Sequence, residues 1–310
     1  MENLWKHDLP EYFGPMTVKE LRQSMRKAGF VYPFLAIQLV AVLAVSVELK
    51  TGGNHFRVTE PGMLNVFMLF ESGPFWSVAG AICMLIMPLS GLWLMKHEVE
   101  EGNHELLQLT PLNRWGIVLG KFFTLWGVCC LTMCSLLPYV VVRYMVGGVE
   151  WWHELACAGT VLGGAAILSS IAIGTSAYQN TARKIGVFLL MSGSFSIGAA
   201  TVLVSSAIAS RHVGLLYHVA AITVVACYVM QGLALARAKL RLTLQYDETR
   251  PSGLLIGWLC LQPFAIGLVT AMSIGYGGFV GLLVFSWVAY MLDYRQKRKA
   301  PAPNIPKFPA

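Results

Sequence analysis

Charged side chains are scarce in this chain of 310 residues. Asp, Glu, Lys and Arg make up 13% of the sequence, hydrophobic residues make up 56%, and the mean hydropathy is +0.60. This composition excludes an ordinary soluble globular domain, whose surface needs more charge. No charged residue lies in the middle of a long apolar segment. Because ion-coupled carriers and proton pumps usually keep an ionisable group at that depth, this absence argues against a secondary transporter.

Several short motifs are also missing, and each absence argues against a class of function. The sequence contains no G-x-x-x-x-G-K-[ST] motif, so the chain is not expected to hydrolyse ATP alone. Residues 1–29 lack an early apolar region and an A-x-A site, so no cleavable signal peptide is expected. The cysteines form no C-x-x-C pair and lie in or beside apolar segments, where free thiols pack as small hydrophobic groups. A soft-metal site at Cys129, Cys130 and Cys134 is the weaker interpretation, because no histidine accompanies them.

The sequence does contain eight apolar segments, most of them long enough for a helix to cross about 30 Å of hydrocarbon. They cover approximately residues 30–47, 74–95, 122–142, 155–178, 185–209, 213–236, 253–273 and 276–292. With a cytoplasmic N-terminus and alternating segments, four of the 23 Lys and Arg residues fall outside and the other 19 inside. The four are Lys50, Arg57, Arg143 and Arg211. Cytoplasmic loops carry such an excess of Lys and Arg, so we predict an all-α polytopic membrane helix bundle with both termini in the cytosol.

The chain is expected to divide into a membrane core and three smaller parts. Residues 30–241 form a six-helix core with a cytoplasmic loop at 96–121, and residues 242–294 add a C-terminal transmembrane hairpin. The two apolar segments of this hairpin fit either a spanning pair or a re-entrant pair. Residues 295–310 form a disordered basic, proline-rich tail.

Residues 1–29 are expected to be cytoplasmic and to end in a basic amphipathic helix. A helix of this kind directly before a membrane span lies flat in the inner interface. The residues that define its apolar stripe and basic face are Lys19, Leu21, Arg22, Met25 and Arg26.

Glycine and hydroxyl side chains are concentrated in the fourth and fifth segments. Gly159 and Gly163 have the G-x-x-x-G spacing that allows helices to approach closely. The hydroxyl groups fit two interpretations, hydrogen bonding between packed helices or a weakly polar lining of a transport pathway. The residues considered for a lining are Ser169, Thr175, Ser192, Ser196 and Thr201. His218 is the only imidazole expected near a span, where we expect it to be hydrogen bonded at the interface.

The connection between the second and third segments carries the most specific pattern in the sequence. Four glutamates lie there, beside a membrane surface that should favour cations: Glu98, Glu100, Glu101 and Glu105. Gly102 is expected to end the helix that leaves the second segment. Thr110 followed by Pro111 is typical of a helix start, with a hydroxyl at the cap and proline in the first turn. From residue types alone, a solvated acidic turn and a docking surface for a basic partner fit equally well.

This stretch resembles the first cytoplasmic loop of the permease subunits of type-2 ABC exporters. The usual pattern of that family is E-x-E-x-G-[ST]-x-E-x-L, a spacer, T-P, a short basic turn and G-K. The matching residues are Glu98, Glu100, Gly102, Glu105, Leu107, Thr110, Pro111, Arg114, Gly120 and Lys121. The basic helix before the first span is similar to the interfacial connecting helix of the family. Two departures are Asn103, where Ser or Thr is usual, and eight segments in place of six.

The resemblance implies a half-transporter. A second permease subunit, identical or related, would associate with this chain in the membrane, and each would dock a cytosolic P-loop ATPase. The loop would be the coupling element, through Glu98, Glu100, Gly102, Glu105, Leu107, Pro111, Arg114 and Lys121. ATP and Mg²⁺ would bind to the ATPase, and this chain would bind no cofactor or metal. The bacterial cytoplasmic membrane is the expected location.

The sequence leaves other functions open. An ATPase-coupled scaffold that transports nothing, or a secondary carrier or channel, would have the same hydropathy. A membrane enzyme would need a cluster such as His97, Glu101 and His104, which share a helix face only if Gly102 does not break the helix. The net charge of +7 collects at membrane ends, which indicates contact with anionic lipid and not with nucleic acid. Nothing selects the cargo, although an apolar interior dotted with hydroxyls mildly favours an amphipathic or lipid-like one.

Overall fold

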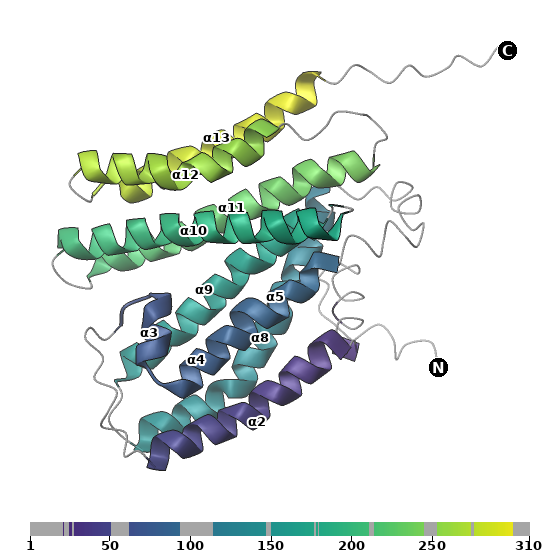
Figure 1. The fold of residues 1–310 in the computed structure, drawn as a ribbon. Coiled ribbons are helices and arrows are strands. Elements are labelled where there is room, and N and C mark those ends of the chain that lie inside the picture. Colours follow the sequence, from purple (N-terminus) through teal and green to yellow (C-terminus); the bar gives the residue numbers. More distant parts are fainter. Residues whose placement is uncertain are drawn as a thin grey trace, which may run out of the picture.

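The computed structural model describes residues 21, 25–26, 28–50, 62–93, 114–146, 150–176, 178, 180–210, 214–244, 253–273 and 276–299. Long helices dominate this part of the chain (Figure 1). Those that are α-helical throughout are α2 (Ala28–Lys50), α8 (Arg114–Val146), α9 (Trp151–Ser176), α10 (Thr181–Ser210), α11 (Leu215–Leu244), α12 (Gly253–Met272) and α13 (Gly278–Lys299). A composite helix joins α4 (Pro74–Gly80), the π-helix η1 (Ala81–Ile86), α5 (Met87–Leu89) and the 3-10 helix η2 (Ser90–Trp93).

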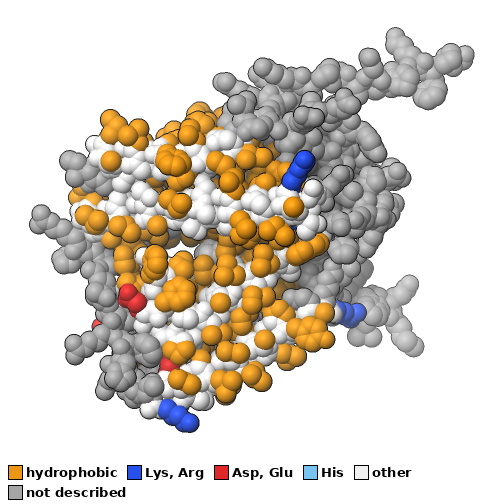
Figure 2. Space-filling model, in the orientation of Figure 1, with side chains coloured by type: hydrophobic (Ala, Val, Ile, Leu, Met, Phe, Trp, Pro, Cys, Tyr) orange, Lys and Arg blue, Asp and Glu red, His pale blue; other side chains and the backbone are white. Residues whose placement is uncertain are grey.

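Seven of the described helices are long and apolar enough to cross a membrane. The eighth predicted segment is the shorter apolar stretch Gly278–Met291 within α13. Figure 2 shows hydrophobic side chains across the visible face of the helices, with the few charged side chains near the helix ends. The prediction of a polytopic helical membrane bundle is therefore confirmed.

Local sequence explains how the chain turns into the composite helix. The short helix α3 (Val66–Glu71) begins at Asn65, whose side chain accepts a hydrogen bond from the Phe67 amide at 3.2 Å. Gly73 has φ +106°, a conformation that a side chain would disfavour, and Pro74 follows at the first helical position. With six residues, α3 is too short to cross a membrane. The chain therefore reverses at residues 72–73 beside the end of α2.

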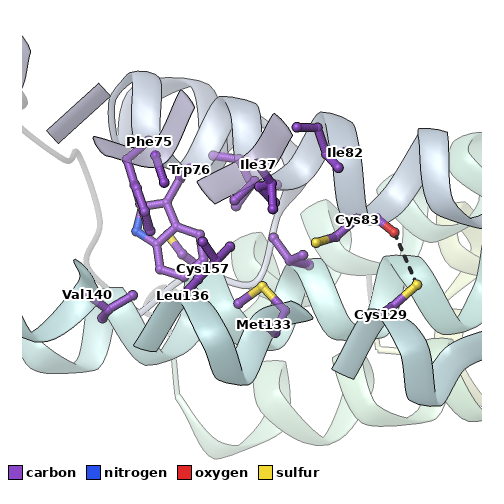
Figure 3. Packing of buried hydrophobic residues seen from close by; sticks show 14 of the residues in the cluster. Ile37, Phe75, Trp76, Ile82, Cys83, Cys129, Met133, Leu136, Val140 and Cys157 are labelled. Carbon is purple, nitrogen blue, oxygen red and sulfur yellow. Dashed lines mark hydrogen bonds between the residues drawn. The ribbon is translucent and has the colours of Figure 1, made fainter. Parts of the chain in front are cut away.

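The two most buried spans are α9 and α11, which lie at the centre of the bundle. On one side lie α2, the composite helix and α8, and on the other lie α10, α12 and α13 (Figure 1). The first group shares an apolar core with α9; Figure 3 shows Trp76, Met133 and Leu136 within it. In the same core the thiol of Cys129 donates to the carbonyl oxygen of Cys83 at 3.6 Å. We call the end of the bundle that contains Lys50 and Trp151 the outer end, following the predicted topology, and the opposite end the inner end.

Small residues let α9 and α11 approach closely. A Cβ atom at Gly232 would lie 2.2 Å from Ser170 Oγ and 2.9 Å from the Ser170 backbone carbon. A Cβ at Gly174 would lie 3.0 Å from the carbonyl oxygen of Gly232. The close contact thus involves backbone on both helices, which cannot move aside as a flexible side chain can. The predicted G-x-x-x-G pair also faces neighbours, since Gly159 lies against Leu64 and Gly163 against Val225.

Substitution of Gly232 by alanine should therefore destabilise the bundle. Overpacking of a tight core typically costs about 1–3 kcal/mol, more than the roughly 1 kcal/mol that alanine gains over glycine in a helix. The matched control is Gly193→Ala in α10, where a Cβ meets nothing within 4 Å. Thermal unfolding of the two variants in detergent measures the difference. We expect a lower melting temperature for Gly232→Ala alone, and equal melting of both variants would contradict the close α9–α11 contact.

Candidate functional site

A buried ionic cluster joins four segments at the outer end of the bundle. Its centre is Arg143, in the last turn of α8, and its carboxylates are Glu48 near the end of α2 and Glu154 in the first turn of α9. Arg143 Nε lies 2.7 Å from Glu48 Oε2, and Nη1 lies 3.0 Å from Glu154 Oε1. The side chains are 4%, 10% and 0% exposed, in the order Arg143, Glu48, Glu154. The cluster is thus a desolvated one, unlike an ordinary surface ion pair.

The reversal at residues 72–76 completes the cluster. Arg143 Nη2 donates to the carbonyl oxygen of Ser72 at 2.7 Å, so all three guanidinium nitrogens are bonded. The Phe75 amide donates to Glu48 Oε1 at 3.1 Å, and Trp76 Nε1 donates to Glu154 Oε2 at 3.0 Å. The guanidinium also lies 5.0 Å from the centroid of the Phe75 ring. These bonds hold α2, α4, α8 and α9 in one arrangement at the outer end.

A second polar group lies beside this cluster. Ser72 Oγ is 2.6 Å from His153 Nε2 and 3.2 Å from Cys157 Sγ, and all three residues are buried. The Ser72 hydroxyl also contacts the Met68 carbonyl oxygen, and His153 Nε2 lies 3.5 Å from Cys157 Sγ. The group fixes the reversal between α3 and α4.

This part of the structure corrects two inferences from sequence. His218 was predicted to be the only imidazole near a span, which is wrong, because His153 is 1% exposed within α9. Arg143 was counted among the residues of the outer connections, whereas it belongs to α8 and lies inside the bundle. One sequence signal could have indicated the cluster. Glu48, Arg143 and Glu154 have opposite charges, and each lies within one turn of the outer end of a different apolar segment.

The predicted coupling loop lies mostly outside the described residues. This holds for Glu98, Glu100, Gly102, Glu105, Leu107 and Pro111. Arg114 begins α8, so the part of the predicted loop from residue 114 to residue 121 is helical. Lys121, two turns further on, is 1% exposed and lies inside the bundle. In the sequence the loop connects η2 to α8. The elements α5 and η1, which precede η2 in the composite helix, both pack against α8.

The predicted interfacial helix is described only in part. Lys19 and Arg22 lie outside the described residues, while Leu21, Met25 and Arg26 are helical. Leu21 packs against the apolar core of the first helix group. Met25 and Arg26 are exposed, so the described residues have one side on the bundle and one side away from it.

The hydroxyl residues considered for a pathway lining do not form one group. Ser169 and Thr175 are buried in α9, and Thr175 donates to the carbonyl oxygen of Ile171 at 3.0 Å. In α10, Ser196 is exposed, whereas Ser192 and Thr201 are half-buried and donate to carbonyl oxygens of their own helix. The structure therefore separates Ser169 and Thr175 from the α10 residues, which lie toward the surface of the bundle.

The thiols of the chain form no recognisable metal centre in the described part. All seven cysteines are free, and no group of three His, Cys, Asp or Glu side chains able to hold a metal occurs among the described residues. Comparisons of the chain with models of known protein families, with curated proteins and with solved structures found no match.

Proposed function

We propose that this chain is the membrane subunit of an ATP-driven exporter that works with a separate cytosolic P-loop ATPase. The observation that carries the proposal is the sequence between η2 and α8, where Glu98, Glu100, Gly102, Glu105 and the Thr110–Pro111 pair have the order of an ABC exporter coupling loop. The chain has no nucleotide-binding motif of its own, so ATP and Mg²⁺ would bind to the partner. A second permease subunit would complete the transporter.

The packing of α8 supports a mechanical role for the helix that follows this loop. α8 has 33 residues, about 50 Å at 1.5 Å per residue, and reaches from the loop to Arg143 at the outer end. In the proposed mechanism, closure of the ATPase pair pushes the loop and tilts α8 against the composite helix. That tilt must rearrange the ionic cluster, because Arg143 holds α2, α4 and α9 together there.

The composite helix is suited to follow such a movement. It contains the π-helix η1 between α4 and α5, and Pro88 lies within α5. π-Helical turns inside spans are frequent at functional sites, since a change of register between π and α moves one end of the helix relative to the other. We propose the bacterial cytoplasmic membrane as the location and an amphipathic or lipid-like molecule as the cargo.

Site-specific photo-crosslinking in native membranes tests the proposed partner. A benzophenone amino acid at Leu107 should form a covalent adduct with a P-loop ATPase, identified by mass spectrometry, because this residue lies in the docking loop. The matched control is the same probe at Tyr276, which is 54% exposed between α12 and α13. An adduct from both positions, or from neither, would contradict docking at the loop.

A further inference from the structure

The four helices α10–α13 enclose a centre that contains buried polar side chains. α12 packs against α10 and α13, α11 also packs against α10 and α13, and α10 and α13 contact each other, so the four helices form one packed group. Tyr228 and Gln231 of α11 and Gln262 of α12 are each at most 1% exposed. Tyr228 Oη, Gln231 Oε1 and both amide atoms of Gln262 have no hydrogen-bond partner among the described residues. Native proteins seldom bury such atoms without a partner, which can be a bound molecule.

Three of the helices meet at the Tyr228 hydroxyl. The Tyr228 ring stacks on Phe195 of α10 with 4.5 Å between ring centroids. A Cβ atom at Gly198 of α10 would lie 2.1 Å from Tyr228 Oη and 3.9 Å from Ile266 Cδ1 of α12. The glycine therefore leaves the space that the hydroxyl occupies, and Ile266 approaches the same point from the third helix.

The two glutamines lie one turn further toward the inner end. Gln231 follows Tyr228 by three residues in α11, and Gln262 precedes Ile266 by four residues in α12. Because α11 and α12 run in opposite directions, both steps lead the same way, by about 4.5–6 Å. Gln231 Nε2 donates to Ser286 Oγ of α13 at 2.7 Å, which fixes the amide at this level and leaves Oε1 unpaired.

A neighbouring carbonyl group shows that the chain can satisfy a polar atom at this depth. Pro263 has no N–H, so the carbonyl oxygen of Leu259 lacks its usual helical donor. Ser194 of α10 supplies the missing donor, with Oγ 2.9 Å from that oxygen. The amide of Gln262, one turn from Leu259, receives no equivalent partner from the described residues. Its pairing is therefore expected to come from outside the described residues.

We propose that the centre of α10–α13 binds an uncharged hydrogen-bonding guest, which pairs with Gln262, Gln231 Oε1 and Tyr228 Oη. The guest must donate as well as accept, because the unpaired atoms include amide oxygens and an amide N–H group. It must also be neutral, since residues 190–200, 224–235, 258–270 and 280–290 contain no Asp, Glu, Lys or Arg to balance a charge. Ordered water and the hydroxyl or amide group of a small organic ligand both have this chemistry. The proposal does not depend on coupling to an ATPase.

High-resolution cryo-electron microscopy of the whole chain in lipid nanodiscs, combined with native mass spectrometry, tests the proposal. We expect non-protein density within about 3 Å of the Gln262 amide, and its loss in Gln262→Leu. Density the size of one atom without added mass identifies water. Extended density, with an added mass that Gln262→Leu abolishes, identifies an organic ligand. Either result supports the site, and the two results distinguish water from an organic ligand as the guest.

The melting temperature of Gln262→Leu distinguishes a dry centre from an occupied one. If the centre is dry, Gln262→Leu removes an unpaired amide and should melt at the same temperature as the wild type or higher. If a guest is bound, the variant loses those hydrogen bonds and should melt lower. The control is Gln38→Leu in α2, which breaks the bond from Gln38 Nε2 to Ser135 Oγ and should leave the density at Gln262 intact. Absence of density in the wild type, together with an equally or more stable Gln262→Leu, would overturn the proposal.

Discussion

Replacement of Arg143 by glutamine is expected to destabilise the chain more than any other single change at the outer end. The substitution leaves two buried carboxylates, Glu48 and Glu154, facing each other without a cation. Removal of one partner from a buried ion pair typically costs about 3–5 kcal/mol, because the remaining charge stays desolvated. Thermal unfolding of the purified chain in detergent should show a large drop in melting temperature.

Two further variants separate this effect from a general loss of charge. Lys50→Gln removes one positive charge from an exposed residue at the same end of the bundle and should leave the melting temperature nearly unchanged. The triple variant Glu48→Gln, Arg143→Met, Glu154→Gln removes all three charges together and should regain most of the lost stability. An Arg143→Gln variant as stable as Lys50→Gln would show that the guanidinium does not hold the outer end together.

Charge reversal of the proposed coupling loop should detach the ATPase without unfolding the membrane part. The variant carries Glu98→Lys, Glu100→Lys and Glu105→Lys. If each exposed charge contributes about 1 kcal/mol to docking, the three changes weaken association by roughly 100-fold. The measurement is the amount of ATPase that co-purifies with equal amounts of tagged permease.

The control for this variant reverses charges at the opposite end of the bundle. Glu71 and Glu150 are exposed there, and Glu71→Lys with Glu150→Lys should retain the ATPase. Both variants should melt close to the wild type, since the changed residues are outside the described apolar cores. Wild-type ATPase recovery in the loop variant would contradict the assignment of Glu98, Glu100 and Glu105 to docking.

Hydropathy was sufficient to predict the helical spans because crossing a bilayer imposes a length and an apolar character on each segment separately. The prediction of segment 276–292 as shorter than the others agrees with the apolar stretch Gly278–Met291. The turn into the composite helix also has local signals, in Asn65, Gly73 and Pro74. The spans and this turn are determined by residues close together in the sequence, so the sequence alone predicts them.

The polar interior could not be predicted in the same way. Glu48, Arg143 and Glu154 are at the margins of three separate segments, where an averaged hydropathy assigns them to water. Their pairing depends on how α2, α8 and α9 pack, which no single segment specifies. The same holds for Gln231 and Gln262, which lie at the same level of the bundle only because α11 and α12 run in opposite directions. Hydroxyl residues such as Ser192 and Thr201 were grouped by composition, although their own helix satisfies them.

We propose that this chain couples ATP hydrolysis by a separate subunit to transport. Purification of the tagged chain from its native membrane in mild detergent, with an assay of ATP hydrolysis and identification of bound proteins by mass spectrometry, tests this coupling. We predict a near-stoichiometric P-loop ATPase and vanadate-sensitive ATP turnover in the eluate. A chain that is recovered alone even after cross-linking, without ATPase activity, would contradict coupling to an ATPase.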